Sequence, residues 1–175
     1  MRKILILAAA FILSANSADN TTTVDNNAAP APIDGWTSCN MEIVTASFGT
    51  KIPMKDIPIA QTTYQINQGV SNLNSGMPIM LFLWQNPRRY AFSMRMVQRP
   101  MTVAFINDKG EIAQIENMKP NSDKQYVSDK PVHAVLEVGK GFLSSHNITI
   151  GSKIVIKQCS APTAFPDQFF KSKDW

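Results

Sequence analysis

Short apolar runs of strand length, separated by Pro, Gly, Asn and Asp, dominate residues 35–160. The run at residues 78–84 contains no polar side chain, which is typical of a strand buried on both faces. Residues 101–106 and 111–118 flank an Asn-Asp-Lys-Gly turn sequence. These two segments therefore predict a β-hairpin.

Two further segments alternate between apolar and polar positions, as a strand with one covered face does. In residues 90–97 the positions expected to face the core are Tyr90, Phe92, Met94 and Met96. Arg95 falls on the opposite face, among small residues. In residues 132–138 the alternation places His133 opposite Val132, Ala134 and Leu136 and predicts a histidine that faces solvent.

Helical patterns are scarce. Residues 62–70 predict a short helix, with Thr62 or Thr63 as the N-terminal cap and Gly69 at its end, and residues 142–147 predict a second short turn. Residues 153–157 add a last strand. About seven strands with one or two short helices indicate a mainly β fold, a single compact β-barrel or sandwich-like domain.

The N-terminus has the pattern of a secretory signal. Arg2 and Lys3 precede ten apolar residues at 4–13, too few to span a bilayer, which needs about 20. Small residues follow, so residues 1–17 predict a cleavable signal peptide, with cleavage after Ser17 or Ala18. An uncleaved anchor is the alternative. We expect a periplasmic or secreted protein with no stable membrane insertion after cleavage.

Composition divides the rest of the chain. Residues 18–34 are rich in Asn, Thr, Ala and Pro and predict a flexible tether, residues 35–160 a β domain, and residues 161–175 a tail rich in proline and aromatic residues. That tail either packs on the domain or offers a sticky peptide to a partner. Without Arg2 and Lys3 the chain has 15 basic and 13 acidic residues, a net charge of 15 − 13 = +2. This value argues against general affinity for nucleic acid or anionic membranes.

Two cysteines, Cys39 and Cys159, lie near the two ends of the expected domain. In an oxidising compartment they predict a disulfide if residues 41–47 and 153–157 form neighbouring strands. Two unpaired thiols are the alternative, because spacing in the sequence does not establish proximity in space. No Cys-x-x-Cys motif or nearby histidine predicts a metal site.

Several stretches between residues 57 and 156 carry a family resemblance through their order and spacing. They are Gly69-Val70-Ser71, Ile79-Met80-Leu81-Phe82, Phe92-Ser93-Met94-Arg95-Met96-Val97, Pro100-Met101-Thr102-Val103 with Phe105-Ile106-Asn107, and Val135-Leu136-Glu137 with Gly141. The chain resembles the family named domain of unknown function 192, which implies a compact β-barrel-like domain, often with a signal peptide, and no established activity. It departs from the family at Ser93, Met96 and Thr102, where relatives have Trp, Asn and Asp.

Candidate catalytic chemistry is sparse. Besides His133, the only histidine is His146, in a polar Ser-Ser-His-Asn turn that does not by itself make a triad. Among scattered carboxylates, Glu137 stands in an apolar strand and matches the family's Glu, so it either has a raised pKa or accepts hydrogen bonds from the backbone or an arginine. Glu111 and Glu116 are the other candidates for a carboxylate pair. We expect no catalytic set and no cofactor, since no phosphate loop, zinc spacing or dinucleotide glycine pattern is present.

The strongest local feature is a cluster of arginines among Trp84, Tyr90 and Phe92. It consists of Arg88, Arg89, Arg95 and Arg99. Arginine with aromatic residues favours anion-binding or protein-binding surfaces, although these arginines could equally be a solvated turn and strand face. The sequence favours a non-catalytic module that binds an anionic ligand or an envelope protein. The alternative is a hydrolase-type enzyme that acts on a cell-envelope polymer.

Overall fold

The structure is a computed structural model that describes residues 35–72, 78–161 and 163. This part of the chain contains nine strands, two short α-helices and one 3₁₀-helix. The expected signal (1–17), tether (18–34) and nearly all of the C-terminal tail (161–175) lie outside the described residues, so those expectations stay predictions. In the ranges that are described, no helix is long and apolar enough to cross a membrane.

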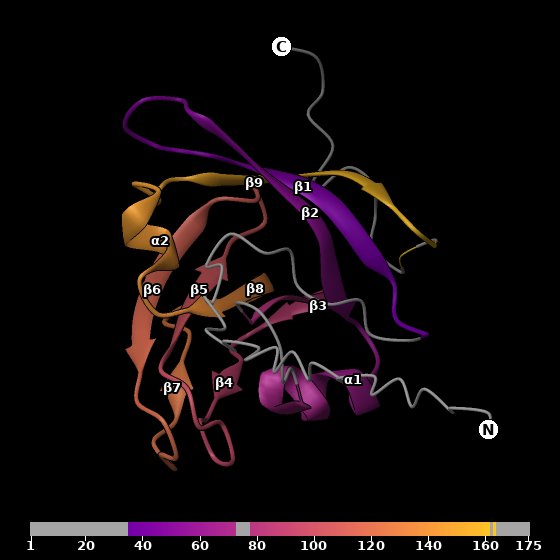
Figure 1. Ribbon diagram of the computed structural model, residues 1–175, viewed down its shortest axis with the longest axis vertical. Coiled ribbons are helices and arrows are strands. Elements are labelled where there is room, and N and C mark those ends of the chain that lie inside the picture. Colours follow the sequence, from indigo (N-terminus) through magenta and orange to yellow (C-terminus); the bar gives the residue numbers. More distant parts are fainter. Residues whose placement is uncertain (1–34, 73–77, 162, 164–175) are drawn as a thin grey trace, which may run out of the picture.

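Seven strands form one mixed sheet in the order β6-β5-β8-β3-β2-β1-β9 (Figure 1). Their bounds are β1 Ser38–Val44, β2 Lys51–Ala60, β3 Ile79–Arg88, β5 Met101–Ile106, β6 Ile112–Met118, β8 Val132–Gly139 and β9 Lys153–Cys159. Only β2 and β3 pair in parallel. The curved sheet is not a closed barrel, although a bridge between Glu111 and Lys153 joins its two edge segments at one end. The mainly β, sandwich-like fold expected from the sequence is confirmed.

Strand β1, next to the edge strand β9, pairs with both β2 and β9, and this arrangement settles the pairing of the cysteines. Cys39 lies directly opposite Cys159 in the β1–β9 register, and the two form a disulfide with a Cα–Cα distance of 4.0 Å. The bridge joins residues 120 positions apart. The predicted disulfide is therefore confirmed, and it ties one edge strand to the beginning of the domain.

A crossover connection joins the parallel strands β2 and β3, as parallel pairing requires. It contains α1 (Thr63–Gln68) and the 3₁₀-helix η1 (Gly69–Asn72). Thr62 caps α1: its Oγ1 accepts a hydrogen bond from the Gln65 backbone N–H, and the Gln65 side chain accepts one from the Thr62 N–H. The helix ends at Gly69, whose φ of 51° suits glycine. The expected short helix is confirmed.

Both faces of the main sheet are covered along β3, so this strand contributes to two apolar clusters. Ile79, Leu81 and Leu83 pack with β1, β2, β9 and the second helix, α2 (Phe142–Ser145). Met80 and Phe82 point to the other face. There the cover comes from α1, η1 and a separate two-stranded sheet of β4 (Ala91–Phe92) and β7 (Tyr126–Val127).

The prediction of one continuous strand over residues 90–97 is wrong for the residues that follow β4. Met94 is buried as expected, but its N–H donates to Ser122 O, and the Val97 N–H donates to Met94 O and closes a turn. Met96 within that turn has a φ of 65° and is 78% exposed, and Arg95 beside it is also exposed. A residue in the left-handed region reverses the chain, so the apolar alternation no longer corresponds to one face.

The expectation of a solvent-facing His133 is also wrong. The His133 side chain is buried, and its Nδ1 lies 3.4 Å from the Trp84 carbonyl oxygen. The reason is that β8 lies between β3 and β5 near the middle of the sheet, and side layers cover both of its faces. Every residue of β8 from Val132 to Val138 is consequently buried.

Candidate functional site

Three adjacent pockets follow the boundary between the crossover segment and the chain from β3 to β5. The central pocket has a volume of about 270 Å³ and shares Ile66, Trp84 and Tyr90 with an outer pocket of about 610 Å³. On its other side it shares Val70, Ser71 and Val97 with a third pocket of about 200 Å³. We call these three pockets together the arginine groove, because each is lined by one arginine: Arg88, Arg95 and Arg99.

An aromatic wall separates the central pocket from the outer one. The rings of Trp84 and Tyr90 stack with centroids 3.7 Å apart, and the Tyr90 hydroxyl donates to Asn86 O at 3.0 Å. Phe92 meets Phe82 edge to face at 5.0 Å. Burial raises the pKa of Tyr90, and the nearby Arg88 partly offsets this effect. Interlocked rings of this kind hold their positions, so the wall offers a preformed surface.

Polar side chains face the aromatic wall from the crossover segment. Asn67, Gln68 and Ser71 of α1 and η1 line the central pocket, together with Ser93 from the chain after β4. Amide and hydroxyl groups of this type both donate and accept hydrogen bonds. The combination resembles general small-molecule sites, which pair apolar walls with a few converging polar groups.

Glu137 on β8 also lines the central pocket. The residue is only 3% exposed, and burial raises its pKa to about 8. The cause of this shift is desolvation, because burial penalises the charged form of the carboxyl group. Of the two alternatives that the sequence left open for Glu137, the structure therefore supports the raised pKa.

The arginines of the predicted cluster separate into two groups. Arg88 at the end of β3, Arg95 in the turn after β4, and Arg99 before β5 line the groove. Arg89 does not line any of the three pockets, and its Nε donates to Ser128 O at 2.8 Å. Arg95 Nε donates to Asp123 Oδ1 at 2.7 Å in a pair whose side chains are both 74% exposed. One Arg95 donor is thus used, and the terminal nitrogens carry four others.

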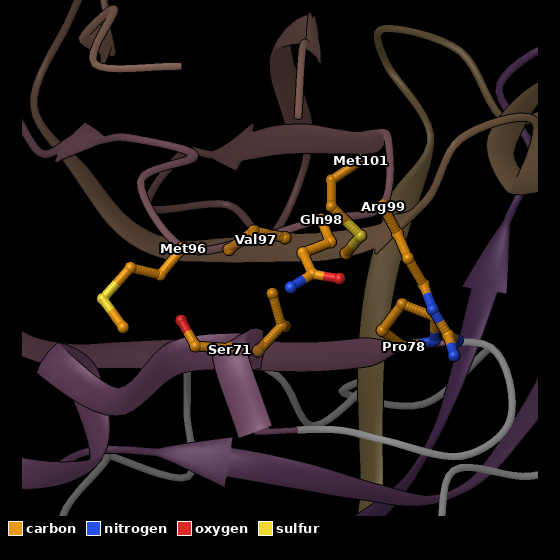
Figure 2. Close-up of a pocket in the computed structure, with 8 residues that line it drawn as sticks. Ser71, Pro78, Met96, Val97, Gln98, Arg99 and Met101 are labelled. Carbon is orange, nitrogen blue, oxygen red and sulfur yellow. The ribbon is translucent and has the colours of Figure 1, made fainter. Parts of the chain in front are cut away.

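Figure 2 shows the third pocket. Ser71 lies across it from Val97 and Gln98, and Met96 and Arg99 mark its opposite ends. Pro78 lies beside the Arg99 side chain. The exposed Met96 side chain is therefore part of the rim of the arginine groove.

The other candidate groups do not join the groove. Glu111 accepts a hydrogen bond from the Asn107 amide at 3.1 Å, and neither Glu111 nor Glu116 lines any of the three pockets. His146 terminates α2, with its Nδ1 2.9 Å from Phe142 O. Across residues 35–72 and 78–161, no group of three His, Cys, Asp or Glu side chains is arranged to hold a metal ion.

The sequence did not point to the residues that α1 and η1 contribute. Asn67 and Gln68 belong to no recognisable motif, and Ser71 belongs only to the Gly69-Val70-Ser71 stretch of the family resemblance, which assigned it no role. The only available signal was the capped helix itself: a crossover between parallel strands lies on a face of the sheet and can form one side of a pocket there. Its position against Trp84 and Glu137 depends on contacts between residues distant in sequence.

Comparison with known proteins adds a family and a fold. Residues 44–156 match the DUF192 family, described as "Uncharacterized ACR". A crystal structure from Sinorhizobium meliloti 1021, described as a candidate transcription regulator, is 26% identical with a TM-score of 0.65, and the match covers 69% of this chain and 95% of that one. A protein of unknown function from Novosphingobium aromaticivorans DSM 12444 is 24% identical with a TM-score of 0.62, and the match covers 77% of this chain and 97% of that one. No curated protein matches the chain. Because the family match spans more than half of the residues of this chain, the chain belongs to the DUF192 family.

Proposed function

We propose that the protein is an exported, non-catalytic module that binds an extended anionic ligand along the arginine groove. The observation that carries this proposal is that each of the three adjacent pockets is lined by one of Arg88, Arg95 and Arg99. Guanidinium groups bind carboxylate, phosphate and sulfate oxygens through charge-assisted hydrogen bonds. A ligand with several negative groups in a row can therefore contact all three pockets.

The groove supplies further contacts that suit a polar polymer. Side-chain amides of Gln61, Gln85 and Asn86 line the outer pocket, and Gln98 lines the third one. These groups can bond to hydroxyl and carbonyl groups between the charges, while Trp84 provides an apolar surface. An envelope polymer that carries acidic groups fits this combination.

An enzyme acting on such a polymer is the second candidate. Glu137 is a possible proton donor inside the groove, but glycoside hydrolysis uses two carboxyl groups that flank the scissile bond. Of the described carboxylates, only Glu137 lines the groove. Binding without turnover is therefore the better supported function.

Nucleic acid is a third possibility, because the relative from Sinorhizobium meliloti is described as a candidate transcription regulator. After removal of the predicted signal the chain has a net charge of 15 − 13 = +2. DNA-binding surfaces are usually far more basic than this. Duplex DNA therefore serves as a comparison probe in the experiment.

Export is supported by the basic and apolar N-terminus and by the disulfide, because disulfides persist mainly in oxidising compartments. Mass spectrometry of the protein purified from the native envelope or medium should find an N-terminus near Ala18 or Asp19. An intact Met1 on that material would contradict export by cleavage.

The binding proposal is tested by calorimetric titration with an oligogalacturonate, inorganic polyphosphate, a sulfated oligosaccharide and duplex DNA. At least one anionic polymer should bind at about 0.1 M salt and weaken strongly at about 1 M, where the screening length falls to about 3 Å. The double variant Arg88→Gln/Arg95→Gln should bind about tenfold more weakly or worse, since each charge-assisted bond is worth about 1.5–3 kcal/mol.

A matched control separates local contacts from overall charge. Lys55→Gln/Lys109→Gln removes the same charge from two exposed positions outside the three pockets and should bind like the wild type. Equal affinity of the arginine double variant and the wild type would refute the groove. Release of shortened oligogalacturonate would favour the enzyme, and preferred binding of DNA would favour the regulator.

A further inference from the structure

Two loops with apolar tips lie together at one end of the main sheet. One is residues 45–50, which join β1 to β2, and the other is residues 147–152, which precede β9. Phe48 in the first loop is 78% exposed, and Ile150 in the second is 61% exposed. Both loops lie near α2 in Figure 1, on the side of the molecule away from α1 and the arginine groove. Two large apolar side chains are therefore presented to solvent outside the groove.

Hydrogen bonds to two buried hydroxyl groups hold both loops in place. Thr45 is buried, and its Oγ1 accepts a hydrogen bond from the Thr50 N–H at 3.0 Å. Ser152 is also buried, and its Oγ accepts from the Ala46 N–H at 3.2 Å and from the Thr149 N–H at 3.0 Å. The second hydroxyl group thus joins the two loops to each other. Because their backbones are already ordered, the loops can present their apolar tips to a partner at a low cost in conformational entropy.

The charges lie behind the tips. Neither loop contains an acidic or basic residue, and the first charged residues after the loops are Lys51 on β2 and Lys153 on β9. These two lysines lie on either side of Val44 in the register of β1. Apolar tips backed by basic residues match the layers of a lipid surface, where anionic headgroups cover the acyl chains. Asp108 and Glu111 in the neighbouring β5–β6 connection offset part of this charge, so the apolar tips provide most of the attraction.

A lipid surface fits the two loops better than a protein partner does. A buried aromatic side chain covers about 150–250 Å², so Phe48 and the smaller Ile150 together contribute less than about 500 Å². A stable protein–protein interface takes about 800 Å² from each partner. The residues beside the tips, including Ser47 and Thr50, are exposed and polar and do not extend the apolar area.

We propose that these two loops dock the protein on the surface of a phospholipid membrane, with the Phe48 and Ile150 side chains inserted at the boundary between headgroups and acyl chains. The contact is peripheral and does not span the bilayer. It uses none of the residues that line the arginine groove, so it goes beyond the function proposed above and does not depend on it.

The experiment measures cosedimentation of the protein with vesicles of phosphatidylethanolamine and phosphatidylglycerol. Phe48→Ser/Ile150→Ser should lower the partition constant at least about tenfold, because two large apolar side chains no longer enter the lipid. Tyr64→Ser/Val127→Thr changes two exposed apolar residues elsewhere on the protein and should bind like the wild type. All variants carry the same N-terminus, so any binding by the predicted signal segment affects them equally.

A second measurement keeps an apolar side chain at the tip. Phe48→Trp and Tyr64→Trp each add one indole at an exposed position. Lipids brominated on their acyl chains should quench the added emission of Phe48→Trp and leave that of Tyr64→Trp unchanged. Thermal melting of every variant confirms that it is folded.

The outcomes separate this inference from the proposed function. Phe48→Ser/Ile150→Ser should bind anionic polymers like the wild type, and Arg88→Gln/Arg95→Gln should bind vesicles like the wild type. Loss of vesicle binding in the arginine variant alone would place the lipid headgroups in the groove and overturn the loop proposal. No vesicle binding by the wild type, equal binding by the loop variant, or absent quenching of Phe48→Trp would also overturn it. Dimerisation of the wild type in sedimentation velocity that Phe48→Ser/Ile150→Ser abolishes would replace the membrane with a second copy of this chain.

Discussion

Replacing Glu137 by glutamine should remove a large pH dependence from the stability of the protein. The folded state holds the proton of Glu137 up to a pKa of about 8, whereas the ordinary value of 4.5 applies to the unfolded chain. Below pH 4.5 both states are protonated and the stability contribution is fully present. As the pH rises from 4.5 through about 8, the unfolded state ionises first and this contribution is lost.

The magnitude follows from the width of that interval. Each pH unit between the two pKa values corresponds to about 1.4 kcal/mol, so the loss at and above pH 8 approaches about 5 kcal/mol. This is a large share of the total, because a typical domain is stable by only about 5–15 kcal/mol. Local rearrangement around the ionised group would reduce the loss, so the value is an upper bound.

Urea denaturation followed by tryptophan fluorescence, at several pH values from about 5 to about 9, measures this effect. The free energy of unfolding of Glu137→Gln should exceed that of the wild type by an amount that grows with pH up to about 8. Glu116→Gln, a change of the same type at a half-buried position on β6, serves as the control and should leave the wild-type pH profile in place. A constant difference between Glu137→Gln and the wild type at every pH would refute the reasoning.

Two further predictions concern stability. Cys39→Ser/Cys159→Ser opens a loop of 120 residues and should lower the free energy of unfolding by about 2–5 kcal/mol in denaturant titrations; a wild-type midpoint insensitive to reducing agent would contradict a structural disulfide. Met96→Asn should raise the thermal midpoint through about 0.5–1 kcal/mol of relieved backbone strain, because Met96 is 78% exposed with a φ of 65°, a conformation that asparagine adopts more readily. A lower midpoint for Met96→Asn would show that the methionine side chain makes a contact that outweighs the strain.

The sequence predicted those elements whose pattern is local. The apolar run at residues 78–84 became the buried part of β3, and the Asn-Asp-Lys-Gly turn joins β5 to β6 as expected. The capping pattern at Thr62 predicted α1 for the same reason, since the capping bonds join residues three positions apart. The prediction of one strand over residues 90–97 failed because the left-handed backbone conformation of Met96 cannot be recognised in a period-two pattern of apolar residues.

Burial in the middle of the sheet was harder to predict than the strands themselves. Alternation along β8 suggested one covered face, but β3 and β5 flank it and layers lie on both sides, so His133 and Glu137 are both buried. In the candidate site, the sequence showed the cluster of arginines. It did not show that only some of these arginines line the groove. Arg89 bonds to Ser128, while Arg95 lines the pocket of Glu137, and both results depend on how distant segments pack.

The most direct test of the central claim is to locate the bound ligand on the protein. Oligogalacturonate is titrated into isotope-labelled protein, and the backbone and indole resonances are followed by NMR. Saturable shifts are expected at the Trp84 indole, around Ser93 and Val97, and at Glu137, with little change at Glu42 and Lys157 on the β1–β9 surface. Shifts centred on β1 and β9 with none at Trp84 or Glu137 would contradict the arginine groove as the ligand site.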